Sequence, residues 1–275
     1  MTPNPVPTCL AIAGSDSGGG AGIQADLKAF ARCGVHGTTA ITALTAQNTV
    51  GVEMVVTVAP KMIVAQVAAV VSDIGVDAIK IGMLADEATI EAVVEALDLV
   101  DGVPIVVDPV MVSESGATLL EPNARAALIE RILPRATVAT PNLAEARALS
   151  ALGSVATQAQ LAEAVRALGP DSVIVTGGHA VDGVGADVLA DENGTIRIEG
   201  PHYPGGASHG SGCTHSSAVA AFLARGADLA DAARWAREIA AEAVGNGLRE
   251  LGHGAGPVDV FGLRAQSRHS DTVGG

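Results

Sequence analysis

A glycine-rich turn at residues 209–217, with the sequence HGSGCTHSS, carries residues suited to anion chemistry. Gly210 and Gly212 allow the amides around them to point inward, and the small-residue helix that follows adds the positive end of its dipole. Such a turn is typical of a site that holds an anion. The same field would lower the pKa of the Cys213 thiol toward neutrality, which makes Cys213 a candidate base or hydrogen-bond partner. The alternative is a cysteine that only packs against the helix start.

Two acidic segments follow apolar runs and indicate a divalent cation beside that anion. VVDPV places Asp108 after an expected strand, and TPNLAEA places Asn142 and Glu145 three positions apart at an expected helix start. Open α/β sheets bind ligands at the carboxyl ends of their strands, and carboxylate and amide oxygens suit a hydrated Mg²⁺ next to phosphates. Two structural alternatives stay open: Asp108 as a turn residue before proline, and Asn142 with Glu145 as a helix capping box.

Three further segments carry polar or sulfur-bearing side chains near strand ends. VTGGH places Thr176 and Gly178 in a turn that suits a nucleotide phosphate, although an ordinary strand-ending turn has the same composition. In LTAQN, Gln47 offers donors and an acceptor for the edge of a heteroaromatic ring that carries an amino group. In KIGML, Met83 suits the face of that ring, and Lys80 lies on a strand without an assigned role. Each of these would be a core or loop residue in most proteins.

A competing hydrolase motif overlaps the glycine turn. GASHG, residues 206–210, matches the nucleophile elbow with Ser208 at its centre. An elbow needs a strand directly before the serine and a helix directly after it, whereas PHYPGGA is no strand and the helix is expected to begin only near Cys213. His209 and His215 flank the cysteine and could tune it, but histidines at helix starts are usually solvated or capping groups.

The first strand-to-helix turn, AGSDSGGGAGIQADLKAF, resembles a dinucleotide-binding turn only superficially. Its third glycine position falls on Ile23, and ITALTAQN carries no acidic residue. The sequence also has no Gly-Lys-Ser/Thr, which excludes a P-loop. We expect a flexible turn whose backbone approaches a ligand closely, with Asp16 inside it and Asp26 beyond it. Helix capping by Asp16 and Ser17 is the alternative.

Short apolar runs alternate with longer helical patterns along most of the chain. PIVVDPV and DSVIVTGG are continuously apolar, as in parallel strands that are covered on both faces. We therefore expect an α/β fold: a doubly wound, mostly parallel central sheet with helices on both faces. ADVLADENGTIRIEG turns at DENG and predicts an antiparallel edge hairpin. Helices from about Cys213 to Arg225 and from about Asp228 to Asn246 close a single domain, residues 1–265, before an expected disordered tail at 266–275.

The amino-acid composition argues against several classes of binding partner. A net charge of −14 and 2% aromatic residues argue against a wide nucleic-acid surface. No apolar run reaches the roughly 18 residues of a membrane helix, and MTPNPVPT lacks the features of a signal peptide. The three cysteines are far apart in the sequence and are expected to be reduced thiols. We therefore expect a cytoplasmic protein that binds small molecules and no nucleic acid or membrane.

Together and in this order, these segments resemble the hydroxymethylpyrimidine/phosphomethylpyrimidine kinases of thiamine biosynthesis, within the ribokinase-like superfamily. The likeness spans roughly Cys9 to Phe261 and rests on AGSDSGGGAGIQADLK, ITALTAQNT, KIGML, VVDPVM, TPNLAEA, VTGGH and HGSGCT. It implies ATP and Mg²⁺ as cofactors and a homodimer. It also implies two phosphoryl transfers, first onto 4-amino-5-hydroxymethyl-2-methylpyrimidine and then onto its monophosphate.

The resemblance also assigns residues. It implies pyrimidine contacts for Gly14, Asp26, Gln47, Met83 and Val110, and Mg²⁺ and phosphate contacts for Asp108, Asn142 and Glu145. It implies nucleotide contacts for Thr176 and Gly178, and a catalytic anion hole formed by Gly210, Ser211, Gly212 and Cys213. Sugar kinases of the superfamily carry an aspartate where this sequence has Cys213. This chain departs from the pattern at Gly18, where relatives often have serine, and in GPVDVF, which lacks a histidine that relatives often carry.

Three other functions stay open. A pyridoxal kinase is similar and shares the Gly-Cys turn, although Gln47 mildly favours an aminopyrimidine. A serine hydrolase would rest on Ser208. A silent nucleotide-binding protein would keep the fold and bind ATP without turnover.

Overall fold

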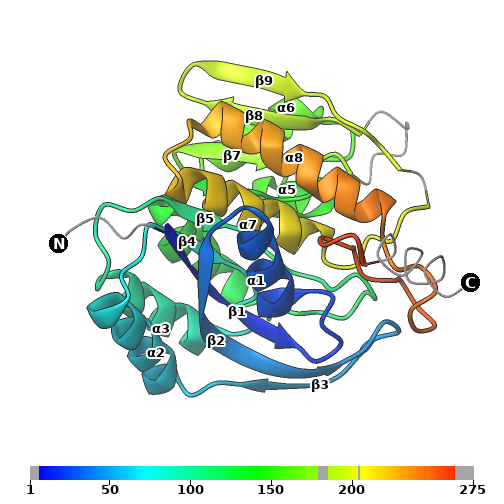
Figure 1. Ribbon diagram of the computed structural model, residues 1–275. Helices are drawn as coiled ribbons and strands as arrows, with labels where there is room; N and C mark the ends of the chain where they lie inside the picture. The colour runs from blue at the N-terminus through cyan, green and yellow to red at the C-terminus, as the bar shows by residue number, and fades with distance from the viewer. Residues whose placement is uncertain (1–5, 179–184, 204, 264–275) are drawn as a thin grey trace, which may run out of the picture.

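The computed structural model describes residues 6–178, 185–203 and 205–263 (Figure 1). Its centre is a nine-stranded sheet with the order β3-β2-β1-β4-β5-β6-β7-β8-β9. The strands are β1 (Thr8–Asp16), β2 (His36–Gln47), β3 (Val52–Thr57), β4 (Ala78–Ile81), β5 (Ile105–Val107), β6 (Val138–Ala139), β7 (Ser172–Val175), β8 (Asp187–Asp191) and β9 (Gly194–Ile198). The expected tail at 266–275 lies outside the described residues.

The middle of the sheet is parallel and both edges are antiparallel. Strands β2, β1, β4, β5, β6 and β7 pair in parallel, whereas β8 pairs antiparallel with β7 and β9 antiparallel with β8. The β8–β9 pair is the hairpin predicted from DENG. Strand β3 adds a second antiparallel edge beside β2, because the short turn at residues 48–51 reverses the chain and is closed by Asn48 N–H donating to Gly51 O at 3.0 Å.

Helices cover both faces of this sheet, as the alternation of runs predicts (Figure 1). One face packs against α2, α3, α4, α5 and α6, and the other against α1, α7 and α8. The helices are α1 (Gly22–Arg32), α2 (Pro60–Asp73), α3 (Glu87–Leu97), α4 (Ala124–Ala127), α5 (Leu143–Ser150), α6 (Gln158–Arg166), α7 (Ser211–Ala224) and α8 (Leu229–Gly245).

The pleat of β1 explains its continuous apolar sequence. Leu10 and Ile12 belong to the core on the α2–α3 side, whereas Cys9 and Ala11 belong to the core on the α1–α7 side. Successive side chains of a strand point to opposite faces, so a strand covered on both sides needs apolar residues at every position.

Two helical segments differ from the sequence expectation. Helix α7 begins at Ser211, two residues before the expected Cys213. The expected helix over NARAALIERIL is instead a four-residue α4 followed by a π-turn at Leu128–Ile132 and a 3₁₀ turn at Leu133–Arg135. Pro134 lies in that last turn and cannot continue a regular helix. Within the described ranges, no helix has the length and apolarity that crossing a bilayer requires.

Candidate active site

A cavity of about 380 Å³ opens where the parallel strands end. Strands β1, β5, β6 and β7 each deliver their last residues, or the residues just after them, to its wall, as expected for an open α/β sheet. The cavity brings together nearly all of the side chains singled out above. Lining it are Gly14, Gln47, Met83, Asp108, Val110, Asn142, Glu145, Thr176, Gly178, Gly210, Ser211, Gly212 and Cys213.

The glycine turn sits at the N-terminus of α7, as predicted. Gly210 caps the helix with φ of +85°, and a Cβ on it would lie 1.8 Å from Gly20 O, so this position requires glycine. Gly212 differs, because a Cβ there would meet no atom within 4 Å. The backbone therefore has free space at Gly212 on the cavity side, where a ligand can approach the first amides of the helix.

The thiol of Cys213 faces the cavity, but its predicted acidity is wrong. Burial raises the pKa of Cys213 to about 12, and the carboxylates of Asp108 and Asp26 act in the same direction. The Lys80 ammonium and a hydrogen bond from the Gly22 amide oppose this rise without cancelling it. The loss of water around the sulfur and the two nearby negative charges outweigh any effect of the helix dipole. Cys213 is therefore a neutral thiol at physiological pH.

Asp26 does not line the cavity, in contrast to the direct pyrimidine contact expected from the resemblance. Its carboxylate is fully buried beneath the site, where it accepts hydrogen bonds from Lys80 Nζ at 2.8 Å and Ser217 Oγ at 2.7 Å. Lys80 Nζ also lies 3.7 Å from Asp108 Oδ2. Lys80, which sequence reasoning left without a role, therefore connects Asp26 to the cavity wall. The available signal was a lysine inside the apolar strand AIKI, because a buried charge needs a partner.

Asn142 and Glu145 form the capping box that was left open as an alternative. Asn142 Oδ1 accepts from Glu145 N, and Glu145 Oε2 accepts from Asn142 N, both at 2.9 Å. Burial, with Asp108 nearby, raises the pKa of Glu145 to about 8. Capping and ligand binding are compatible here, because both residues also line the cavity.

These oxygens fit a Mg²⁺ ion. Asp108, Thr140 and Glu145 bring hard oxygen donors to one wall, and two neighbouring carboxylates gain from a cation between them. No group of three or more His, Cys, Asp or Glu side chains suited to a metal occurs in the part of the chain that the structure describes. Mg²⁺ usually keeps several waters and binds one or two carboxylates together with substrate phosphates, which is the situation that this wall offers.

Gly14, Gln47 and Met83 line a part of the cavity that suits a flat ring. A Cβ on Gly14 would lie 3.0 Å from Met83 Sδ, so glycine leaves room for the thioether there. Gln47 Oε1 accepts from Thr45 Oγ1 at 3.1 Å, and Ser17 Oγ donates to Gln47 O at 2.7 Å. These bonds hold the main-chain oxygen and the side-chain oxygen of Gln47. The side-chain amide group of Gln47 stays available as a polar edge beside the apolar side chain of Met83.

Asp16 organises the first loop instead of capping α1. Its carboxylate accepts from the amides of Gly18, Gly20 and Ala21 at 2.7, 3.1 and 2.8 Å, and it lies 2.9 Å from His209 Nε2. The His209 contact joins the first loop to the glycine turn across 193 positions. Sequence reasoning treated His209 only as a neighbour of Cys213, since nothing local indicates a partner so far away.

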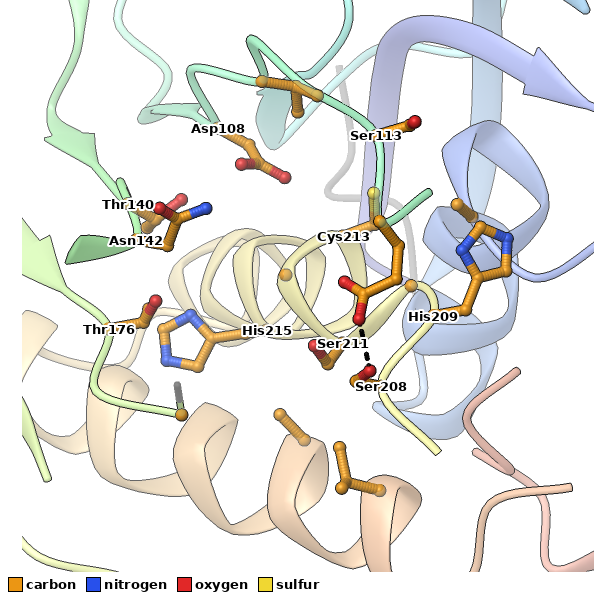
Figure 2. A pocket seen from close by; sticks show the side chains of 18 of the residues that line it. Asp108, Ser113, Thr140, Asn142, Thr176, Ser208, His209, Ser211, Cys213 and His215 are labelled. Carbon is orange, nitrogen blue, oxygen red and sulfur yellow. Dashed lines mark hydrogen bonds between the residues drawn. The ribbon is translucent and has the colours of Figure 1, made fainter. Parts of the chain in front are cut away.

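Thr176 and Gly178 lie at the end of the cavity that faces β7 and β8. Figure 2 shows Thr176 beside Thr140 and Asn142, on the side away from Ser113 and His209. The amide of the intervening Gly177 donates to Asp187 Oδ1 at 2.9 Å. Three buried residues that sequence reasoning did not place in the site stand here as well: Asp187, His215 and Arg237.

Ser208 lacks the setting of a hydrolase nucleophile. Residues 205–208 form no strand, and α7 begins only at Ser211. The Ser208 hydroxyl donates to Glu114 Oε1 at 2.5 Å, the dashed line in Figure 2. Its bond to a carboxylate ties two loops together across the cavity and offers no histidine base.

Comparison with known proteins identifies the family of this chain. The family model described as phosphomethylpyrimidine kinase matches residues 16–259. A hydroxymethylpyrimidine/phosphomethylpyrimidine kinase of Rhizobium meliloti is 46% identical over 256 residues, which cover 92% of this chain and 96% of that protein. The ADP complex of Bacillus subtilis pyridoxal kinase matches with a TM-score of 0.85 at 36% identity, covering 94% of this chain and 99% of that one. Phosphomethylpyrimidine kinase from Clostridium difficile matches with a TM-score of 0.74 at 39% identity, covering 84% and 96%.

The fold and the site define an ATP-dependent phosphotransferase of the ribokinase-like class. The glycine turn, the carboxyl groups of Asp108 and Glu145, and the side chains of Gln47 and Met83 line one cavity at the strand ends. Within the class, the chain belongs to the phosphomethylpyrimidine kinase family.

Proposed function

We propose that this enzyme transfers the γ-phosphoryl group of ATP to 4-amino-5-hydroxymethyl-2-methylpyrimidine and then to the monophosphate, giving the diphosphate used in thiamine diphosphate synthesis. The observation that carries the proposal is a single cavity whose lining includes the Gly210–Cys213 turn, the pair Gln47 and Met83 proposed for the ring, and Thr176 proposed for the nucleotide. A phosphoryl group placed at the turn would face an acceptor on one side and its donor on the other.

The glycine turn would stabilise the phosphoryl group in transfer. The amides of Gly210, Ser211 and Gly212 lie at the positive end of α7, and Cys213 stands directly after them. With a pKa of about 12, the Cys213 thiol serves as a hydrogen-bond partner that orients the acceptor oxygen. A neutral partner suffices, because phosphoryl transfer has a loose transition state in which positioning and charge neutralisation contribute most. The second acceptor, a phosphate, is already largely anionic at neutral pH and needs no base.

Asp108, Asn142 and Glu145 would hold the Mg²⁺ ion and the phosphates. When bound, the ion would neutralise charge on the phosphate oxygens. The side chains themselves fix where that charge is accepted, because Glu145 is tied to Asn142 by the capping box and Asp108 is held near Lys80. Thr176 and Gly178 would lie against the nucleotide.

The pyrimidine would occupy the ring-binding end. Gln47 would meet the edge that carries the amino group, Met83 its face, and Gly14 and Val110 would leave space beside it. Asp26 would influence the site only by holding the Lys80 ammonium, because its carboxylate contacts that ammonium and does not line the cavity.

Pyridoxal is the second candidate acceptor. It is favoured by the structural match to the Bacillus subtilis pyridoxal kinase, whose TM-score of 0.85 exceeds the 0.74 of the phosphomethylpyrimidine kinase from Clostridium difficile. Sequence identity points the other way, since it is 46% to the pyrimidine kinase of Rhizobium meliloti and 36% to the pyridoxal kinase.

A coupled assay tests the proposal. Purified protein receives Mg-ATP with the hydroxymethylpyrimidine, its monophosphate or pyridoxal, and ADP is counted per acceptor. We expect ADP formation with both pyrimidines and kcat/KM for pyridoxal at least about tenfold lower, the difference of roughly one hydrogen bond. ADP formation with pyridoxal alone would overturn the assignment. ATP binding without ADP formation would indicate the silent nucleotide-binding protein.

The expected homodimer and cytoplasmic location stay predictions. One surface supports the dimer: Met54 and Val56 on edge strand β3, with Leu44 on the adjoining β2, are 62%, 55% and 52% exposed. An edge strand with exposed apolar side chains is a surface that proteins usually cover. Sedimentation of the wild-type protein and of Met54→Glu would test it, with a monomeric variant as the expected result.

A further inference from the structure

His215 is a buried histidine in the wall of the cavity that the roles above do not use. It lies on α7 one turn after Ser211, it is only 4% exposed, and it lines the cavity. In Figure 2 its ring stands beside Thr176, on the side of the cavity away from His209. Residues four apart share one face of a helix, so His215 continues the face that begins with Ser211 and turns toward β7 and β8.

Asp187 holds this histidine from behind. His215 Nε2 lies 3.2 Å from Asp187 Oδ2, while the other oxygen of the same carboxylate accepts from Gly177 N at 2.9 Å and lies 3.7 Å from Arg237 Nη1. Burial alone would raise the pKa of Asp187, but the contacts with His215, Arg237 and the Gly177 amide outweigh it and lower that pKa. Asp187 is therefore an ionised carboxylate, and Nε2 is the ring nitrogen that faces it.

The other ring nitrogen lacks even a contact of this kind. His215 Nδ1 is buried and has no hydrogen bond within the described ranges, whereas Nε2 has the 3.2 Å ion-pair contact with Asp187, although without the geometry of a hydrogen bond. An unsatisfied buried polar atom is unfavourable, and a ligand atom in the cavity would relieve it. The neighbours of the ring are residues to which the proposed function assigns the nucleotide: Thr176 stands beside it, and the Gly177 amide between Thr176 and Gly178 donates to the same carboxylate.

We propose that His215 is a nucleotide-binding residue whose Nδ1 contacts a phosphate oxygen of ATP or ADP, and that Asp187 is a positioning residue that sets both the imidazole and the Gly177 turn. The inference rests on the proposed function in placing the nucleotide at this end of the cavity. In a hydrogen bond between Nδ1 and a phosphate oxygen, the nitrogen is the donor and the oxygen the acceptor.

The test is ADP binding by calorimetry, without any acceptor. His215→Leu removes both nitrogens, His215→Asn retains a polar group near the position of Nδ1, and His215→Gln retains one near Nε2. We expect His215→Leu and His215→Gln to weaken ADP binding about 10- to 100-fold, the effect of one charge-assisted hydrogen bond, and His215→Asn to recover part of it. The KM for ATP should rise in parallel, whereas the KM for the pyrimidine should stay within about twofold.

Controls separate this contact from a structural role. His36→Gln changes an exposed histidine at the start of β2 and should leave ADP binding unchanged. Adenosine, which lacks phosphate, should bind wild type and His215→Gln equally, and a matching loss with adenosine would overturn the phosphate contact. ADP affinity in His215→Gln equal to wild type would overturn the proposal altogether. If His215→Leu fails to fold, judged by loss of pyrimidine binding, the His215→Gln and His215→Asn variants still test whether His215 contacts the phosphate.

Different results would overturn the acceptor assignment and the His215 proposal. If no pyrimidine supports ADP formation but His215→Gln still binds ADP weakly, the acceptor assignment is wrong and the nucleotide contact stands. If pyrimidine phosphorylation is confirmed while every His215 variant binds ADP normally, only the histidine inference falls.

Discussion

Lys80 Nζ lies 2.8 Å from Asp26 Oδ1, and both side chains are fully buried beneath the cavity. Burial alone would lower the pKa of Lys80, but Asp26 and the other nearby groups raise it above its ordinary value, so the ammonium stays charged. The Lys80 ammonium is therefore a fixed positive charge between Asp26 and Asp108, and it lies 3.7 Å from the Asp108 carboxylate.

Replacing only one partner of this ion pair should lower the free energy of unfolding more than replacing both. Lys80→Met leaves the Asp26 carboxylate buried without its partner and should lower the free energy of unfolding by about 3–5 kcal/mol. The double variant Asp26→Asn/Lys80→Met leaves no net buried charge and should lose less. Urea unfolding followed by circular dichroism measures both. A double variant less stable than Lys80→Met would show that the pair itself is strongly stabilising.

The two glycines of the turn should respond oppositely to alanine. Gly210→Ala forces a Cβ into Gly20 O at positive φ and should destabilise the protein by about 2 kcal/mol or more. Gly212→Ala meets open space inside α7 and should be neutral or stabilising by about 0.5–1 kcal/mol. Thermal unfolding checks stability. The same Gly212→Ala protein should nevertheless lose about tenfold or more in kcat/KM, because its methyl group stands where a phosphate approaches the amides. Full activity would contradict the anion-hole role.

The Cys213 thiol should react slowly. With a pKa of about 12, roughly one molecule in ten thousand carries the thiolate at pH 8, against about a quarter for an ordinary cysteine. Iodoacetamide should therefore label Cys213 at least about 100-fold more slowly in the native protein than in urea. Peptide mass spectrometry over time measures both rates. Labelling at equal rates would show that the pKa of Cys213 is not raised and would support the acidic thiol predicted from the helix dipole.

Cys213→Ala should separate the two phosphoryl transfers. The hydroxymethyl acceptor must lose a proton and needs orientation, so its kcat should fall by about 10- to 100-fold. The monophosphate acceptor is already anionic, so its kcat should fall by less than about threefold. Single-acceptor assays with each pyrimidine give the ratio. Equal losses in both steps would indicate a purely structural thiol.

Stability should depend on pH through Glu145. Its folded-state pKa of about 8 lies above the ordinary 4.5, so the folded state holds this proton more tightly than the unfolded chain. The resulting stabilisation is complete below pH 4.5 and is lost as the pH rises through about 8. In metal-free buffer the free energy of unfolding should thus fall by about 1–4 kcal/mol between pH 5 and 8. Glu145→Gln, which can still complete a capping box, is the matched control and should flatten this slope. An identical slope in wild type and variant would exclude Glu145 as its source.

The sequence predicted those features that local patterns determine. The continuously apolar runs identified the parallel strands, DENG identified the β8–β9 hairpin, and Asn142 with Glu145 had the spacing of the capping box that the structure contains. The glycine turn was placed at a helix start because glycine, small residues and helix periodicity are all visible within a few positions.

Features that depend on distant partners were not predictable. Asp26 and Lys80 are separated by 54 positions and Asp16 and His209 by 193, so only the folded sheet brings each pair together. The pKa of Cys213 was predicted in the wrong direction, because it depends on burial and on Asp108, neither of which the turn itself contains. The contact of His215 with Asp187 of β8 likewise forms only in the folded chain.

The contact between Gly20 and Gly210 limits how this site can be redesigned. Their backbones approach so closely that neither loop tolerates a side chain at that point, and His209 and Pro257 crowd the same glycine from the other side. A loop grafted from a related kinase to change the acceptor would collide with its partner unless that partner came with it. Residues 17–21 and 205–212 therefore form one exchangeable module, and specificity has to be transplanted with both halves at once.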